Sequence, residues 1–126
     1  MDLYRQVILD HYKHPHNFGH LPHATHTAES YNATCGDKIT MEIRLKKGNK
    51  KGSAYIDDIR FHGEGCAISQ AAASLLTELV KEKHVDAVMK LGGDDVVALL
   101  GTPLTPSRVK CATLPLEVIH KAIQSK

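Results

Sequence analysis

The sequence predicts an α+β fold in which a small three-stranded antiparallel sheet carries helices packed on one face. Apolar and polar residues alternate over residues 39–46 and 53–62, which is typical of strands with one face toward solvent. After Cys66 the apolar residues recur with the period of a helix. Strands that precede the helices, instead of alternating with them, favour an α+β architecture.

The first third of the chain predicts one helix and one strand. Apolar residues recur at helical spacing over residues 2–13, and Pro15 ends this helix because proline disfavours a helical residue before it. Residues 14–27 are rich in His, Pro and Gly, and we expect an irregular segment lying over the surface. Residues 28–34 are predicted to form the first strand, which leads directly into Cys35.

The second and third strands are predicted to form a hairpin with one irregularity. Glycines and an asparagine over residues 47–52 favour a tight turn, because these residues adopt positive φ readily. In the third strand the apolar positions shift from Ile56 to Ile59, across Asp57 and Asp58. One extra residue at this point predicts a β-bulge.

Four helices are predicted in the second half, over residues 67–82, 85–91, 94–100 and the C-terminal segment. Because proline is tolerated in the first turn of a helix, Pro115 predicts that the last helix begins close to it. Pro103 and Pro106 then bracket a loop, and Cys111 lies at or just before the start of the last helix.

Length and composition exclude several classes of protein. The 126 residues fit one domain, spanning residues 1–126, and 42% apolar residues exclude a disordered chain. No apolar run approaches the ~18 residues of a membrane span. A net charge of +2 is too small to favour nucleic acid as a partner. The N-terminus lacks an apolar signal region, so we expect a cytoplasmic protein that binds neither nucleic acid nor membrane.

The three cysteines are the first candidates for chemistry. In a reducing compartment an odd number of cysteines disfavours a disulfide framework. Cys35, Cys66 and Cys111 each lie where a predicted element ends, so they can converge at one end of the sheet. With Asp37 they would form a four-ligand set suited to Zn²⁺ or to the irons of an iron–sulfur cluster. Their spacing matches no paired finger motif, so buried, unrelated cysteines are an equally weighted alternative on pattern alone.

Histidines are concentrated near the N-terminus, where six lie between residues 11 and 26. A metal-delivery patch is one interpretation of this segment. A polar loop that binds metal only incidentally is the favoured one.

Four segments in order carry a resemblance to a known family. They are DHYKHPHNFG from residue 10, CGD from residue 35, GEGCAIS from residue 63 and RVKCATL from residue 108. Together they resemble the IscU/SufU/NifU-N family of iron–sulfur cluster assembly proteins over nearly the whole chain.

The resemblance implies both a site and an activity. Cys35, Asp37, Cys66 and Cys111 would converge on one exposed metal site that holds a transient [2Fe–2S] cluster, with Zn²⁺ as a resting or alternative metal. Sulfur would come from a pyridoxal-phosphate-dependent cysteine desulfurase. The cluster would pass to apo iron–sulfur proteins or carriers.

Two functions within the family stay open. The lysine before the third cysteine, Lys110, resembles SufU-type zinc-dependent sulfurtransferases and favours Cys35 as the persulfide acceptor. The segment between Cys66 and Cys111 has the length of an IscU-type scaffold, for which Cys111 is the alternative acceptor. The scaffold is the favoured interpretation. A small structural zinc domain is a third interpretation, which the lack of paired cysteines disfavours.

Overall fold

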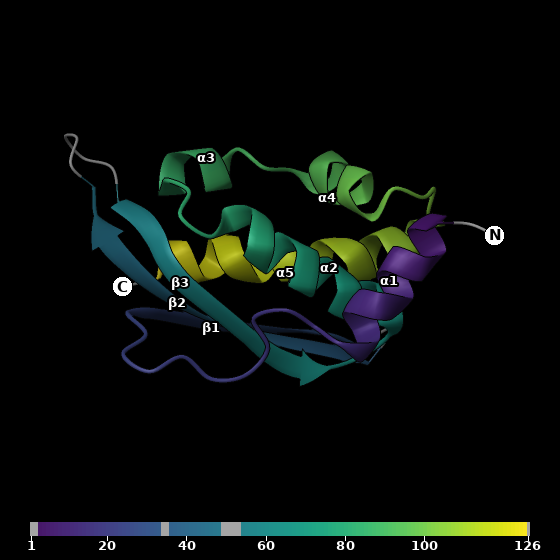
Figure 1. Cartoon of the computed structure of the whole chain (residues 1–126), viewed down its shortest axis with the longest axis horizontal. Helices are drawn as coiled ribbons and strands as arrows, with labels where there is room; N and C mark the ends of the chain where they lie inside the picture. The colour runs from purple at the N-terminus through teal and green to yellow at the C-terminus, as the bar shows by residue number, and fades with distance from the viewer. Residues whose placement is uncertain (1–2, 34–35, 49–53, 126) are drawn as a thin grey trace.

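The computed structural model describes residues 3–33, 36–48 and 54–125. Along the chain a first helix is followed by three strands and then by further helices (Figure 1). The bounds are α1 Leu3–Lys13, β1 His26–Asn32, β2 Asp37–Lys47, β3 Ala54–Glu64, α2 Ala67–Val80, α3 Val85–Met89, α4 Gly93–Leu100 and α5 Pro106–Gln124. The predicted turn at residues 47–52 falls mostly outside the described residues.

The strands form one antiparallel sheet in the order β1-β2-β3, which confirms the predicted α+β class. The predicted bulge is confirmed as well. Arg44 is the partner of Asp58 and Leu45 is the partner of Ile56, so Asp57 is the extra residue of β3. The bulge allows Ile56 and Ile59 to face the same side of the sheet although three positions separate them, and both are fully buried.

The helices cover one face of the sheet in two layers. Figure 1 shows α2 and α5 lying along the sheet, with α3 and α4 beyond them and α1 at one end. Ile39, Met41 and Ile43 of β2 belong to one buried apolar cluster with Leu76 of α2 and Ile119 of α5. The core therefore lies between the sheet and the first helical layer, and the opposite face of the sheet carries the polar positions of the strands.

The irregular segment between α1 and β1 is tied to the sheet by backbone hydrogen bonds. The Phe61 N–H donates to the Asn17 carbonyl at 2.9 Å, and the Gly19 N–H donates to the Phe61 carbonyl at 2.8 Å. At its other end the Thr25 N–H donates to the Ile43 carbonyl at 2.8 Å. The segment thereby covers the outer edge of β3, an edge strand whose backbone groups would otherwise be open to pairing.

The last helix differs from its prediction. It begins at Pro106, not near Pro115, so Pro115 lies buried inside α5. Pro106 occupies the first turn, where a missing N–H costs nothing because that group has no partner within the helix. Pro115 removes one hydrogen bond from the helix interior, and its side chain is buried. Cys111 is consequently a helical residue and not a loop residue.

Within the part of the chain that is described, no helix is both long enough and apolar enough to cross a membrane.

Candidate metal centre

Asp37 and Cys66 join the start of β2 to the start of α2. Asp37 is completely buried, and its Oδ1 accepts a hydrogen bond from the Cys66 N–H at 2.8 Å. Its Oδ2 lies 3.8 Å from Cys66 Sγ. Cys66 is the N-cap residue of α2, so the positive end of the helix dipole stabilises negative charge at this point. The carboxylate thus positions the cysteine backbone and also faces its sulfur.

Two glycines explain how β3 passes so close to Asp37. Gly63 and Gly65 have φ values of +148° and +155°, which side chains disfavour. A Cβ on Gly65 would lie 2.2 Å from Asp37 Oδ1, and one on Gly63 would lie 2.0 Å from the Lys38 carbonyl oxygen. The Gly-Glu-Gly sequence before Cys66 is therefore a steric requirement of this site.

Cys111 brings α5 to the same point. Ligand atoms of Asp37, Cys66 and Cys111 all lie within 4.8 Å of one another. Two sulfurs and a carboxylate oxygen at this spacing fit one ion of Zn²⁺ or iron, because both metals accept thiolate and carboxylate ligands. The structure thus brings together three of the four residues that the sequence predicts as ligands.

The fourth predicted ligand, Cys35, lies outside the described residues. The three described residues are less open than the expected exposed site. Asp37 and Cys111 are fully buried, and only Cys66 is partly accessible. The difference at Cys111 follows from the early start of α5, which places this residue on a helix face that packs into the core.

The surface beside Cys111 is hollowed between the end of β1 and α5. Exposed Tyr31 and Lys110 stand on its two sides, and Glu117 lies about two helical turns after Lys110 along α5. Lys110 immediately precedes Cys111 in the sequence, and the charged residues that line the hollow are one cation, Lys110, and one anion, Glu117.

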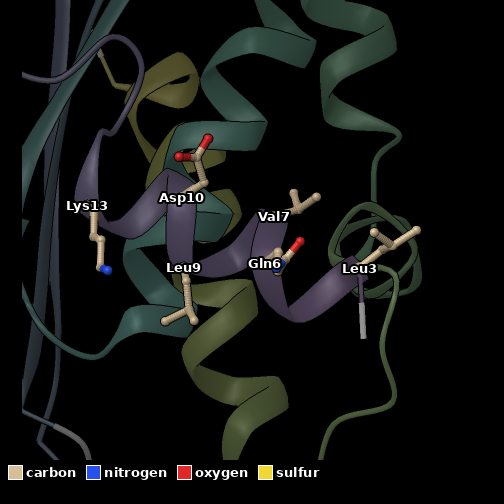
Figure 2. Close-up of a pocket in the computed structure, with 6 residues that line it drawn as sticks. All are labelled: Leu3, Gln6, Val7, Leu9, Asp10 and Lys13. Carbon is tan, nitrogen blue, oxygen red and sulfur yellow. The ribbon is translucent and has the colours of Figure 1, made fainter. Parts of the chain in front are cut away.

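A second hollow follows α1, but its residues do not converge on a point. Figure 2 shows Val7 and Asp10 projecting to one side of the helix and Leu9 to the other. The lining residues are Leu3, Gln6, Val7, Leu9, Asp10 and Lys13. They include no thiol and no histidine, so this groove is not a candidate for the chemistry of the cysteines.

A separate cluster, which sequence reasoning missed, lies on the polar face of the sheet. His20 Nδ1 and His62 Nε2 lie 3.0 and 2.8 Å from Glu42 Oε2. Burial by itself would raise the pKa of Glu42. Hydrogen bonds from the Leu21 N–H, His62 and His20 outweigh burial, so the pKa of Glu42 is lowered. One pattern in the sequence could have indicated this cluster. The alternation of side chains along β2 and β3 places Glu42 and His62 on the same face of the sheet.

Comparisons with known proteins agree with the fold and with the sequence motifs. The family model of the NifU-like N-terminal domain matches residues 3–125. The chain is 36% identical over 138 aligned positions to the zinc-dependent sulfurtransferase SufU of Bacillus subtilis, covering 96% of this chain and 89% of that protein. It is 35% identical over 121 positions to the iron–sulfur cluster assembly scaffold protein IscU of Aquifex aeolicus, covering 96% of this chain and 74% of that protein.

A solved structure shows the same arrangement of elements. It is a proposed iron–sulfur cluster assembly scaffold protein for the SUF system from Fervidobacterium islandicum AW-1, with a TM-score of 0.71 and 25% sequence identity. The match covers 94% of this chain and 95% of that chain. With the family model matching nearly every residue, the chain belongs to the NifU-like N-terminal domain family.

Proposed function

We propose that this chain is an iron–sulfur cluster assembly scaffold that builds a transient [2Fe–2S] cluster on Cys35, Asp37, Cys66 and Cys111. The observation that carries the proposal is the convergence of Asp37, Cys66 and Cys111 from three separate elements, with ligand atoms within 4.8 Å of one another. Family membership supports the same role. The cluster is cargo, which the scaffold passes to apo iron–sulfur proteins or carriers.

Sulfur would arrive from a pyridoxal-phosphate-dependent cysteine desulfurase by thiol exchange. The thiolate of Cys35, or alternatively of Cys111, attacks the outer sulfur of the desulfurase persulfide. A new S–S bond forms on the acceptor, and the desulfurase cysteine leaves as a thiolate, so this step involves no net oxidation. Reduction of the transferred sulfur to sulfide then requires two electrons from an added thiol or other reductant. The full burial of Cys111 favours Cys35 as the acceptor.

Three thiolates and one carboxylate suit a cluster that must be released to another protein. A carboxylate is a harder ligand than a thiolate and binds cluster iron less strongly. Asp37 would therefore be the ligand from which the cluster is released.

A SufU-type zinc-dependent sulfurtransferase is the second candidate function. Lys110, immediately before Cys111, favours it. In this role Zn²⁺ would be held by the same residues, and the chain would relieve the desulfurase of its sulfur. The short segment between Cys66 and Cys111, which resembles that of IscU-type proteins, favours the scaffold.

Sulfide release by a cysteine desulfurase distinguishes the two functions. The chain is loaded with zinc and mixed with desulfurase, cysteine and reductant, and sulfide is measured with and without the chain. A scaffold is expected to change turnover little. With Fe²⁺ in place of zinc, under anaerobic conditions, it should develop the visible absorption of a cluster, and Cys66→Ser should abolish that absorption.

The contrary result would be equally informative. A large zinc-dependent rise in turnover that is lost in Cys35→Ala would establish the sulfurtransferase. Absence of both the rise and the chromophore would contradict both functions.

A further inference from the structure

We propose that His20, Glu42 and His62 form a second binding site for a first-row divalent cation such as Zn²⁺ or Fe²⁺, independent of the cysteines. The three residues come from different segments: the irregular segment before β1, the middle of β2 and the end of β3. Their ligand atoms all lie within 4.8 Å of one another. This inference concerns a site beyond the proposed scaffold function.

The two imidazole rings are already aimed at one carboxylate oxygen. His20 Nδ1 and His62 Nε2 approach Glu42 Oε2 at 3.0 and 2.8 Å, and the ring centroids are 4.4 Å apart. A cation bound between the three atoms would require shifts of the order of 1 Å, because metal–nitrogen and metal–oxygen bonds are about 2.0–2.2 Å long.

The other carboxylate oxygen is held by the backbone. The Leu21 N–H donates to Glu42 Oε1 at 3.0 Å. A hydrogen bond of this kind orients a ligating carboxylate and leaves the second oxygen for the metal. Arg44 and Arg60, the nearby cations of the same face, are paired with Asp57 and Asp58. Their charges are thus largely neutralised near Glu42.

The types of ligand atom at this site indicate which cations it can bind, and the exposure of the side chains indicates how the coordination would be completed. Two imidazoles and one carboxylate suit zinc and iron(II), whereas Mg²⁺ and Ca²⁺ prefer oxygen ligands alone. The Glu42 side chain is only 14% exposed, but the His20 side chain is 81% exposed. One side of the site is consequently open to water molecules, which would complete the coordination.

The site lies apart from the candidate cysteine centre. Glu42 is five residues from Asp37 along β2, or about 17 Å at 3.3–3.4 Å per residue. The two side chains also face opposite sides of the strand, because Asp37 belongs to the buried set and Glu42 to the polar set. Binding at one site can therefore be lost without loss of the other.

Zinc titration of the whole chain under reducing conditions, followed by competition with a chromophoric chelator, tests the proposal. The unmodified chain should bind one more equivalent of zinc than His20→Asn. In that variant the second site should weaken by at least about tenfold. His23→Asn, which changes an exposed histidine in the same segment, is the matched control and should retain the full stoichiometry. With Co²⁺ as probe, sulfur-to-metal charge transfer should be the same in all three proteins.

Long-range ¹H–¹⁵N spectra of the imidazoles supply a second measurement. Zinc should shift the signals of His20 Nδ1 and His62 Nε2, and it should leave His23 unchanged. Equal zinc stoichiometry in His20→Asn, or imidazole signals that zinc leaves in place, would overturn the proposal. The cluster would then be only a hydrogen-bonded clamp that holds residues 20–21 on the sheet.

Discussion

At the scale of single residues, Asp37 has two separable roles. Its Oδ1 fixes the Cys66 backbone, and its Oδ2 faces the Cys66 sulfur. In the function that we propose, Asp37 would position the first turn of α2 and would also contribute a metal ligand. It would thereby couple the fold to the lifetime of the bound cluster. The two roles can be separated because an amide retains the hydrogen-bond acceptor but is a poorer metal ligand.

Asp37→Ala is expected to hold a longer-lived cluster than the unmodified chain. The substitution removes the hard, weakly binding ligand through which we propose that the cluster is released. Decay of the visible absorption in the presence of an apo acceptor protein gives the lifetime. Asp37→Asn is the control, because it keeps an acceptor for the Cys66 N–H. Faster decay in Asp37→Ala than in the unmodified chain would contradict this role.

Gly65→Ala should weaken metal binding at the cysteine centre. The added Cβ would lie 2.2 Å from Asp37 Oδ1, so the carboxylate must move. The strained φ adds about 1–3 kcal/mol to the free-energy cost of folding. Gly19→Ala is the control, since Gly19 also has positive φ but a Cβ added there would meet no atom within 4 Å. Zinc affinity should fall in Gly65→Ala alone, and equal affinities would refute the steric argument.

At the scale of elements, local periodicity was sufficient for most of the fold. The change in apolar positions between Ile56 and Ile59 predicted the bulge, because each face of a strand repeats every two residues. The start of α5 could not be predicted in the same way. Pro106 and Pro115 are each compatible with a first turn, and only packing against the sheet shows that Pro115 is tolerated inside the helix.

Deletion of Asp57 should leave the fold intact. Without this residue, Arg44 and Leu45 of β2 would face Asp58 and Ile56 in an unbroken ladder, and Ile56 and Ile59 would still share the buried face. The loss is limited to ion pairs of Asp57 with Arg44 and Lys46. We expect a small decrease in the urea midpoint of unfolding.

Deletion of Arg60 is the matched control for this prediction. It would make Ile59 and Phe61 adjacent, so one of the two must leave the core. Removing a large apolar side chain from a core costs about 3–5 kcal/mol, so this variant should unfold at much lower urea or fail to fold. Similar midpoints for the two deletions would show that the bulge does not set the register of β3.

At the scale of the whole molecule, both candidate sites depend on contacts between residues far apart in the chain. Asp37, Cys66 and Cys111 were predicted because the cysteines lie where predicted elements end and because the motifs around these residues resemble the family. Their burial was not predictable, since it depends on how α5 packs. The cluster of His20, Glu42 and His62 left no motif, because the strand register and the path of the irregular segment bring its members together only in the folded chain.

The irregular segment and α1 are also joined to the helical layer through a histidine, which makes stability depend on pH. His11 Nδ1 lies 2.7 Å from Ser74 Oγ of α2, and the same oxygen accepts the His16 N–H at 2.8 Å. Burial and the nearby His16 lower the pKa of His11 below its ordinary value of 6.5, although Asp10 opposes them. The folded state therefore favours neutral His11.

The free energy of unfolding should accordingly decrease as the pH falls below about 6.5. The stabilisation from neutral His11 is complete above its unfolded pKa and is lost as the pH passes through the lower folded value. The pKa values of Asp57 and Asp58 are lowered too, but their contribution is lost only in more acidic solution, below their ordinary value of 3.8.

Urea unfolding between pH 8 and pH 5 measures the contribution of His11 without that of the two aspartates. In His11→Asn the decrease should be smaller than in the unmodified chain, whereas the exposed control His14→Asn should retain it. Parallel pH profiles for the unmodified chain and His11→Asn would show that burial and the nearby His16 do not make this histidine a source of the pH dependence.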